Sequence, residues 1–277
     1  MDDEQVKREV WDGSVPVCFS IDDEEVSFNR SNLPEPCYIM IPRISYFPLV
    51  YEKLEKLFAK AADFQPGADE LWLSFEEQPL KWHYPVGVLY DLYGRNCRLP
   101  WTLTVHFKNF PEDSLLHYQK ESLESHVRSK VKEADTLKHR SEVMNSMTPQ
   151  EVGQLWEGFK HNNFTDFWTV NKKLMRTIRG DKSPFRYIPF CVYKEGSPTY
   201  QRLITSVSSE TEGKAQTLFD LLNLYDKHRS LSPDHTAMIH GTEVPGVTPL
   251  QWLSEHFSYP DNFLHICIVP KDTPETT

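Results

Sequence analysis

The sequence predicts an α+β protein in which two small units, each built from a hairpin, a helix and two further strands, flank a helix-rich region. Three observations lead to this fold class. The same order of strand and helix patterns occurs near both ends of the chain. A near-repeat, "PLKW" at residues 79–82 and "PLQW" at residues 249–252, follows at the same place in each series. Between the two series, residues 114–179 carry helical patterns and few strand-forming residues.

The first unit begins with two β-rich segments, residues 15–21 and 37–45, which are bounded by Asp, Asn and Pro. Residues 49–62 repeat apolar side chains with the 3.6-residue period of an amphipathic helix. Alternation over residues 70–77 predicts a half-buried strand, and the apolar run at residues 99–107 predicts the last strand.

The middle region begins with residues 114–147, which predict one long helix or two in series. The next helix has a clear start signal, because Thr148 is an N-cap residue, Pro149 follows it, and Glu151 completes a capping box. The Asn pair at 162–163 is a candidate break in that helix.

The second unit repeats the order of the first. Residues 186–193 and 200–207 predict a hairpin, residues 215–228 a helix, and residues 235–241 and 259–269 two further strands. A hairpin, a helix across one sheet face and two more strands describe the β-grasp or ubiquitin-like fold. Two unrelated small α+β domains are the alternative.

These patterns divide the chain into five parts, with a link between the last two domains at residues 179–184. The predicted parts are an N-terminal helix or tail (1–13), a first ubiquitin-like domain (14–112), a helix-rich domain (113–184), a second ubiquitin-like domain (185–271) and a tail (272–277).

Composition restricts the function. The formal net charge is −10 at pH 7, which argues against nucleic acid as the main ligand, since phosphate binding needs a basic face. Five cysteines without C-x-x-C spacing favour a reducing, cytoplasmic setting over a disulfide framework. The acidic N-terminus has no secretory signal, and no apolar run approaches the ~20 residues of a membrane-spanning helix. Any membrane association is therefore expected to be peripheral.

Motifs for catalysis are absent from the sequence. It has no phosphate-binding glycine loop, no nucleophile elbow and no zinc-protease motif, and its eleven histidines lack metal-ligand spacing. We therefore predict no cofactor, no metal ion and no catalytic residue. A cysteine hydrolase is the enzyme alternative, but apolar neighbours predict that Cys18, Cys191 and Cys267 are buried and inert. The carboxylates of residues 22–25 are expected to be solvated.

Ubiquitin-like modifiers end in a glycine whose carboxylate is activated. This sequence ends "PKDTPETT", so we expect an acceptor, adaptor or scaffold rather than a modifier.

The stretch "SKVKEADTLKH", residues 129–139, contains three lysines. On a helical wheel Lys130 lies within an apolar stripe, Lys132 lies about 180° from its centre, and Lys138 lies at its border. A lysine that attacks a thioester must be reachable, so the wheel favours Lys132, although most exposed lysines serve only solubility. The stripe comprises Leu116, Leu123, Val127, Ala134 and Leu137.

Several segments resemble the autophagy protein 5 family. They are "PLKWHYPVG" (79–87), "LPWTLTVHFKNFP" (99–111), "KEADTLKHRS" (132–141), "FRYIPF" (185–190), "MIHG" (238–241) and above all "TPLQWLSEHFSYPDNFLHICIVP" (248–270). The resemblance implies two ubiquitin-like domains flanking a helix-rich domain. It also implies that the lysine of a Lys-Glu-Ala-Asp motif, here Lys132, forms an isopeptide bond with the C-terminal glycine of autophagy protein 12.

The resemblance further implies how such a conjugate works. It binds a helix of autophagy protein 16 in a groove and is recruited peripherally to the preautophagosomal membrane. It then acts like a ligase, without a catalytic site of its own, and promotes transfer of autophagy protein 8 relatives from a conjugating enzyme to phosphatidylethanolamine.

The expected groove draws on residues 41–45 and 85–92, with Arg43, Gly87 and Asp91 as candidate contacts. Without the resemblance, these three residues would be an ordinary strand-end charge, a glycine at a helix start and a solvated acid. A non-covalent adaptor that only docks a helical partner is the alternative function.

Overall fold

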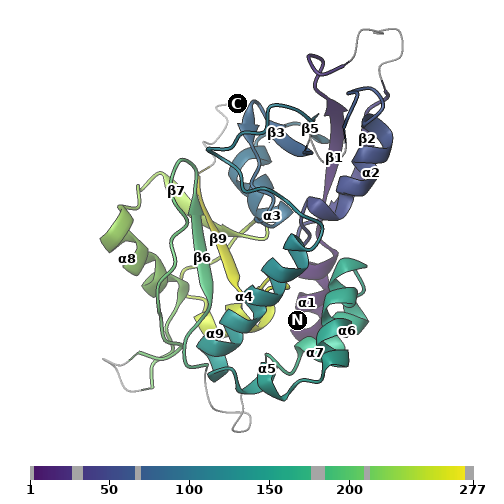
Figure 1. Ribbon diagram of the computed structural model, residues 1–277. Coiled ribbons are helices and arrows are strands. Elements are labelled where there is room, and N and C mark those ends of the chain that lie inside the picture. Colours follow the sequence, from purple (N-terminus) through teal and green to yellow (C-terminus); the bar gives the residue numbers. More distant parts are fainter. Residues whose placement is uncertain (1–2, 27–33, 66–69, 176–184, 209–212, 272–277) are drawn as a thin grey trace. The chain divides into compact units, whose positions relative to one another are not determined.

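The computed structural model describes residues 3–26, 34–65, 70–175, 185–208 and 213–271 (Figure 1). The chain forms two compact units, one of Gly13–Leu123 and one of Met1–Asp12 with Glu124–Thr277. In the described part of the chain, no helix combines the length and apolarity needed to cross a bilayer. The predicted link at residues 179–184 and the predicted tail at 272–277 lie outside the described residues.

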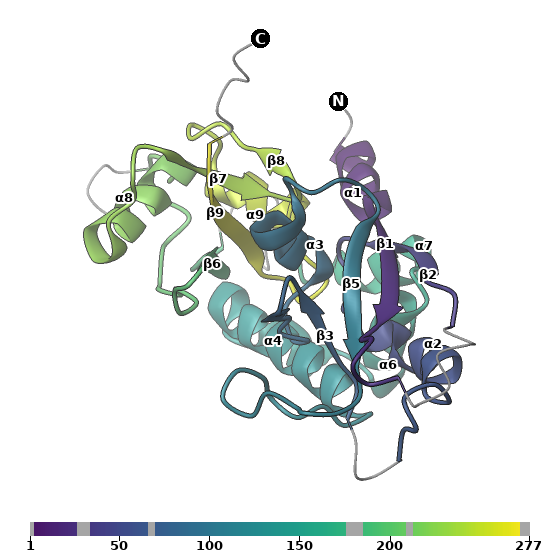
Figure 2. The ribbon, with the colours of Figure 1, turned by 90° about the horizontal axis from the view of Figure 1, so that it is seen from above.

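The unit formed by Gly13–Leu123 contains a five-stranded mixed sheet in the order β2-β1-β5-β3-β4. β1 pairs with β2 antiparallel and with β5 parallel, and Figure 2 shows β1 and β5 side by side. This is the β-grasp arrangement that the order of patterns predicted. The strands are β1 (Ser14–Ile21), β2 (Cys37–Pro42), β3 (Trp72–Phe75), β4 (Gln78–Pro79) and β5 (Trp101–His106).

Alternation explains how this sheet buries one face. Val15, Val17 and Phe19 of β1 are all buried, and so is Trp101 of β5, because successive side chains of a strand point to opposite faces. Helix α2 (Pro48–Phe58) buries Tyr51, Leu54 and Phe58 from its apolar stripe, as its 3.6-residue period predicts.

After β4, a short helix, α3 (Val86–Leu89), continues into a π-helical turn, η2 (Tyr90–Gly94). The turn ends at a glycine for a steric reason. A Cβ atom on Gly94 would lie 2.7 Å from the Tyr90 ring and 2.8 Å from the Trp101 indole. The backbone therefore packs directly on Trp101.

The second unit has a four-stranded sheet in the order β6-β9-β7-β8, again with its first and last strands parallel. The second series of strand and helix patterns therefore also forms a β-grasp sheet. Its elements are β6 (Phe190–Lys194), α8 (Leu218–Arg229), β7 (His235–Ile239), β8 (Thr242–Glu243), α9 (Leu250–His256) and β9 (Leu264–Pro270).

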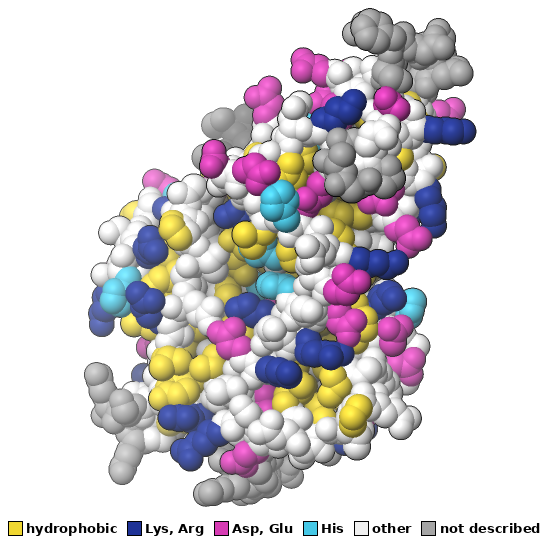
Figure 3. Space-filling model, viewed as in Figure 1, with side chains coloured by type: hydrophobic (Ala, Val, Ile, Leu, Met, Phe, Trp, Pro, Cys, Tyr) yellow, Lys and Arg dark blue, Asp and Glu magenta, His cyan; other side chains and the backbone are white. Residues whose placement is uncertain are grey.

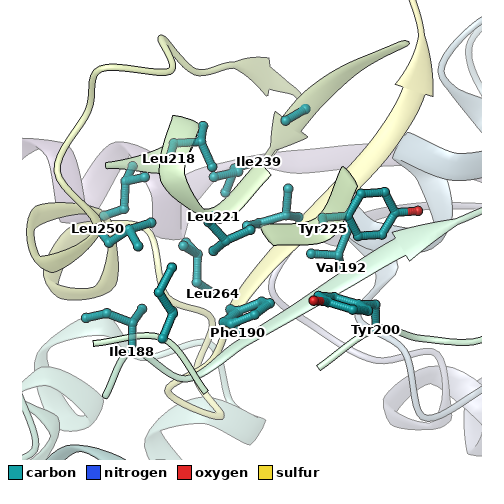
Figure 4. Packing of buried hydrophobic residues seen from close by; sticks show 14 of the residues in the cluster. Ile188, Phe190, Val192, Tyr200, Leu218, Leu221, Tyr225, Ile239, Leu250 and Leu264 are labelled. Atoms are coloured by element: carbon teal, nitrogen blue, oxygen red, sulfur yellow. The ribbon is translucent and has the colours of Figure 1, made fainter. Parts of the chain in front are cut away.

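Helices α8 and α9 supply much of the core of this sheet (Figure 4). Leu218, Leu221 and Tyr225 come from α8 at helical spacing and point toward the strands, where Phe190 and Leu264 meet them. All five side chains are at most 2% exposed. Each buried aliphatic or aromatic side chain of this kind contributes roughly 1.5–3 kcal/mol to stability.

The predicted hairpin at residues 186–193 and 200–207 is only half correct. β6 forms, but the second segment pairs with the first only through an isolated bridge between Tyr200 and Val192 and a backbone bond from the Ile188 amide to the Ile204 carbonyl. Val207 bridges to Ala215 instead. Tyr200 and Ile204 are buried, whereas Leu203 is 61% exposed. Arg202, which a continuous strand would place on the same face as Tyr200 and Ile204, is exposed, so the buried face is interrupted there.

The two near-repeated tetrapeptides occupy different places in their units. Pro79 ends β4, and Trp82 lies in the turn that follows. Pro249 is instead the N-cap of α9, which contains Trp252. The four letters do not mark equivalent positions, and the order of elements is what the two units share.

Residues 114–147, where one long helix or two in series were predicted, contain two helices. α4 (Ser122–His139) ends at Arg140 and Ser141, whose φ angles are +57° and +67°, and α5 (Glu142–Ser146) follows. Residues 114–121 form no helix. Left-handed backbone stops an α-helix because the next amide N–H no longer points at the carbonyl four residues before it.

The predicted start and break of the next helix are both confirmed. Thr148 caps α6 (Pro149–Lys160) through the capping box with Glu151. Asn163 caps α7 (Phe164–Asn171) by accepting a bond of 3.1 Å from the Asp166 amide. Helix α1 (Asp3–Asp12) packs on α7, with the Trp11 and Phe167 rings 4.9 Å apart.

Candidate functional site

Helix α4 places its three lysines in three different environments. Lys132 is exposed, and within the described residues its ammonium has no hydrogen-bond or ion-pair partner. The Lys130 side chain is 24% exposed, and Lys138 is 4% exposed. Of the three, only Lys132 presents an unpaired amine to solvent, in agreement with the wheel.

Lys130 is held by contacts on two sides. Its Nζ donates to Glu133 Oε2 at 3.1 Å and lies 4.4 Å from the centre of the Phe263 ring. Burial alone would lower the pKa of Lys130, but the Cys191 sulfur and the Glu133 carboxylate raise it overall. Lys130 therefore stays protonated, and its ammonium lies over a ring instead of extending into water.

The prediction that Lys138 borders the stripe is wrong, because Lys138 faces the core. Its Nζ contacts Met175 Sδ at 3.3 Å and lies 4.7 Å from the centre of the Phe185 ring. Burial lowers the pKa of this ammonium to about 7. The wheel misplaced the stripe because it left out Val131, which is 1% exposed, and counted Leu137, which is only half-buried.

The residues that follow Lys132 each have a distinct structural position. Glu133 Oε1 accepts a bond of 2.7 Å from Gln201 Nε2, which ties α4 to the second ubiquitin-like domain. Ala134 is completely buried. Asp135 is 1% exposed, and its carboxylate accepts from the Met144 amide at 2.8 Å. The Lys-Glu-Ala-Asp stretch thus points one lysine outward and anchors the three residues behind it.

Replacement of Asp135 by alanine is expected to destabilise this part of the protein. The buried carboxylate bonds to the Met144 amide and, at 2.9 Å, to His139 Nδ1, and alanine would leave both groups without that partner. An unsatisfied buried donor costs about 1–3 kcal/mol. Urea unfolding of Asp135→Ala should show this loss, whereas Glu142→Ala, an exposed change on α5, should be near neutral. Equal stabilities would contradict the assignment.

The predicted groove residues Arg43, Gly87 and Asp91 lie together. The Arg43 guanidinium forms an ion pair with Asp91 and donates to the Gly87 carbonyl at 3.3 Å. The Gly87 amide donates to the Arg43 carbonyl at 2.7 Å. These bonds join the turn after β2 to α3 and η2.

The ordinary interpretation of these three residues is wrong for Asp91. Its side chain is 2% exposed and that of Arg43 is 11% exposed, so the acid is not solvated. The Arg43 guanidinium carbon also lies 5.5 Å from the centre of the Tyr90 ring. Burial raises the pKa of the Tyr90 hydroxyl. With so little exposed surface, the ion pair acts mainly by positioning α3 and η2.

One of the carboxylates expected to be solvated is buried. Glu25 is 8% exposed and accepts from the Phe107 amide at 2.7 Å. Asp22 and His106 lie beside it, with 3.0 Å between Asp22 Oδ2 and His106 Nδ1. The three could hold a metal ion by spacing alone, but these atoms already bond to one another and to the end of β5. Sequence spacing could not show this cluster, because His106 is 81 residues from Glu25.

The prediction that three of the thiols are buried is confirmed. Cys18, Cys191 and Cys267 are buried and form no disulfide. Burial raises the pKa of Cys191 to about 12, which keeps the thiol protonated and unreactive at neutral pH.

Three family models match the chain along most of its length. The model described as the UblA domain of autophagy protein ATG5 matches residues 10–107, the alpha-helical bundle region of the same family matches residues 120–177, and its UblB domain matches residues 187–268. The two ubiquitin-like sheets and the helices between them in sequence agree with these matches.

Whole proteins give the same result. The chain is similar to autophagy protein 5 of Drosophila melanogaster, with 43% identity over 98% of each chain. It is also similar to autophagy-related protein 5 of Caenorhabditis elegans, with 30% identity over 96% of this chain and 98% of the relative. A crystal structure of Kluyveromyces marxianus Atg5 shares the fold, with a TM-score of 0.79 at 20% identity, over 95% of this chain and 99% of that one.

Proposed function

Because the chain belongs to the autophagy protein 5 family, we propose that it is the acceptor and scaffold subunit of an autophagy conjugate. Lys132 forms an isopeptide bond with the terminal glycine of the ubiquitin-like autophagy protein 12. The conjugate binds autophagy protein 16 and acts like a ligase, without a catalytic site of its own, in the lipidation of autophagy protein 8 relatives.

The exposed, unpaired amine of Lys132 is the observation that carries this proposal. Its neutral form attacks the carbonyl of the thioester that links the donor to the conjugating enzyme. A C–N bond forms, the C–S bond breaks, the thiolate leaves with the enzyme, and the amine loses its proton to solvent. An ordinary lysine is neutral in only about one molecule in 2,500 at pH 7. Among lysines with the same neutral fraction, the one whose amine the conjugating enzyme can reach reacts.

The scaffold role is supported by the ion pair of Arg43 and Asp91. A partner helix of autophagy protein 16 that docks in a groove needs a fixed wall, and this buried pair holds α3 and η2 against the turn after β2. We propose that Arg43, Gly87 and Asp91 act on partner binding by positioning that wall.

The assembly is proposed to work in the cytoplasm and at the preautophagosomal membrane, to which it is recruited peripherally. The proposed domain extents are 14–112, 113–184 and 185–271, with residues 1–13 as an N-terminal segment. Nucleic acid, cofactors and metal ions have no part in this function.

Mapping the bond in the reconstituted conjugate tests the acceptor assignment. Tryptic digestion should yield a branched peptide in which the donor's C-terminal residues are attached to Lys132, because an acylated lysine is no longer cleaved. Lys130 and Lys138 should appear unbranched. A branch on another lysine would disprove the assignment of Lys132.

A non-covalent adaptor that only docks a helical partner is the second candidate function. It is favoured by the same positioning of α3 and η2, which requires no bond at Lys132. In cells, this function predicts a single band at the unmodified mass. A larger band that resists reducing agents would exclude it.

A further inference from the structure

An open pocket lies beside Lys132, between α4, α5 and α6, and we call it the acceptor pocket. Its volume is ≈ 610 Å³. The view in Figure 3 shows hydrophobic side chains gathered over this part of the helical region, next to Lys and Arg side chains. Its lining includes Lys132, Met144, Asn145, Met147, Val152 and Gly153.

The walls of the acceptor pocket are held in place by buried or paired groups. The Asp135 carboxylate accepts from the Met144 amide at 2.8 Å. The Thr136 and Ser141 hydroxyl oxygens are 2.6 Å apart, which closes the turn between α4 and α5. The capping box at Thr148 starts α6 opposite them. The pocket is therefore a built feature of the fold.

Two glycines of α6 differ in the space that lies in front of them. A Cβ atom on Gly158 would lie 2.6 Å from the Phe167 amide nitrogen, so α7 requires that glycine. A Cβ atom on Gly153 would meet nothing within 4 Å. A glycine inside a helix costs roughly 0.5–1 kcal/mol relative to alanine. Gly153 therefore borders open space in the pocket, where a larger side chain could be introduced.

The lining suits an extended peptide with an apolar side chain. Met144, Met147 and Val152 offer apolar surface, and methionine adapts its shape to what it contacts. The Asn145 side-chain amide has no hydrogen-bond partner among the described residues. An amide can donate and accept at once, which matches the paired N–H and C=O groups of a peptide backbone.

We infer, resting on the proposed function, that the acceptor pocket binds the extended C-terminal tail of the ubiquitin-like donor. An apolar side chain of that tail packs on Met144, Met147 and Val152, and Asn145 bonds the tail backbone. The thioester carbonyl then lies beside Lys132 Nζ. Holding two reacting groups together in this way replaces a bimolecular encounter and accelerates the transfer.

Single-turnover transfer from the purified donor–conjugating enzyme thioester to the full chain tests this inference. Gly153→Trp starts a large side chain at a position where a Cβ atom meets nothing within 4 Å, and it should lower the transfer rate at least tenfold and raise the half-saturating concentration. Asn145→Ala should lower the rate severalfold. Gly153→Ala is the matched control, with a rate within twofold of the parent and a raised melting temperature.

Shielding of the amine is measured separately. A small amine-acylating ester should modify Lys132 equally fast in the parent and in Gly153→Trp, since the substitution blocks the tail site and leaves the amine open. Equal slowing of both reactions would overturn the inference. Parent-like transfer by Gly153→Trp and Asn145→Ala, with Lys132→Arg inactive, would also overturn it but leave the acceptor role intact. Transfer to Lys132→Arg would instead disprove the proposed function.

Discussion

Lys132→Arg is expected to abolish conjugate formation in a reconstituted reaction. Arginine keeps the positive charge and the exposed position on α4, so the fold and its solubility should not change. The guanidinium, however, is neutral in roughly 10²–10³ times fewer molecules than a lysine amine at neutral pH, and it is a delocalised group. Band intensity of the conjugate on a reducing gel, followed over time, measures the loss.

Lys130→Arg is the matched control for this loss, two residues away on the same helix. Arginine can keep both the ion pair with Glu133 and the contact with the Phe263 ring, so conjugation should proceed at the parental rate. Conjugate formation by Lys132→Arg, or its loss in Lys130→Arg, would contradict the assignment of the acceptor.

Local patterns predicted the elements that depend on neighbouring residues. The capping box at Thr148 and the break before Asn163 need only three or four residues each, so they were readable from the sequence. The second strand of the predicted hairpin was not, because its pairing depends on Tyr200 and Ile204 alone. An apolar pair four residues apart satisfies a strand pattern and an irregular segment equally well.

The candidate site was predictable to the same extent. Exposure of Lys132 follows from the helical period, but the acylation role came from the resemblance. The ion pair of Arg43 with Asp91 joins residues 48 positions apart, and burial of Glu25 depends on the end of β5. Such contacts depend on which strands become neighbours in the sheet. A single sequence shows the order of the strands along the chain but not these pairings. The acceptor pocket likewise needs the left-handed turn at Arg140 and Ser141. The sequence did not predict this turn, because neither residue is a glycine or asparagine, the types that favour left-handed backbone.

Lys138→Met is expected to stabilise the protein, most strongly at low pH. The ammonium of Lys138 is buried against Met175 and Phe185, and burial lowers its pKa to about 7 from 10.5. The unfolded chain therefore binds a proton that the native state lacks between pH 7 and 10.5. Through this group, stability rises with pH across that window, and its cost is greatest below pH 7.

Methionine has a similar length and no charge, so it removes this cost while filling the same space. Each step of one in pKa is worth about 1.36 kcal/mol, which gives an upper limit of about 5 kcal/mol and an expected gain of about 2–5 kcal/mol near pH 6. The gain should shrink as the pH approaches 10. Urea unfolding at both pH values measures it, with the exposed change Lys132→Met as the control that should show neither effect. A loss of stability, or a gain independent of pH, would mean that Lys138 is charged and paired in the native state. Because Lys138→Met retains Lys132, it should still accept the donor at the parental rate, which separates the buried, easily deprotonated amine of this helix from the reachable one.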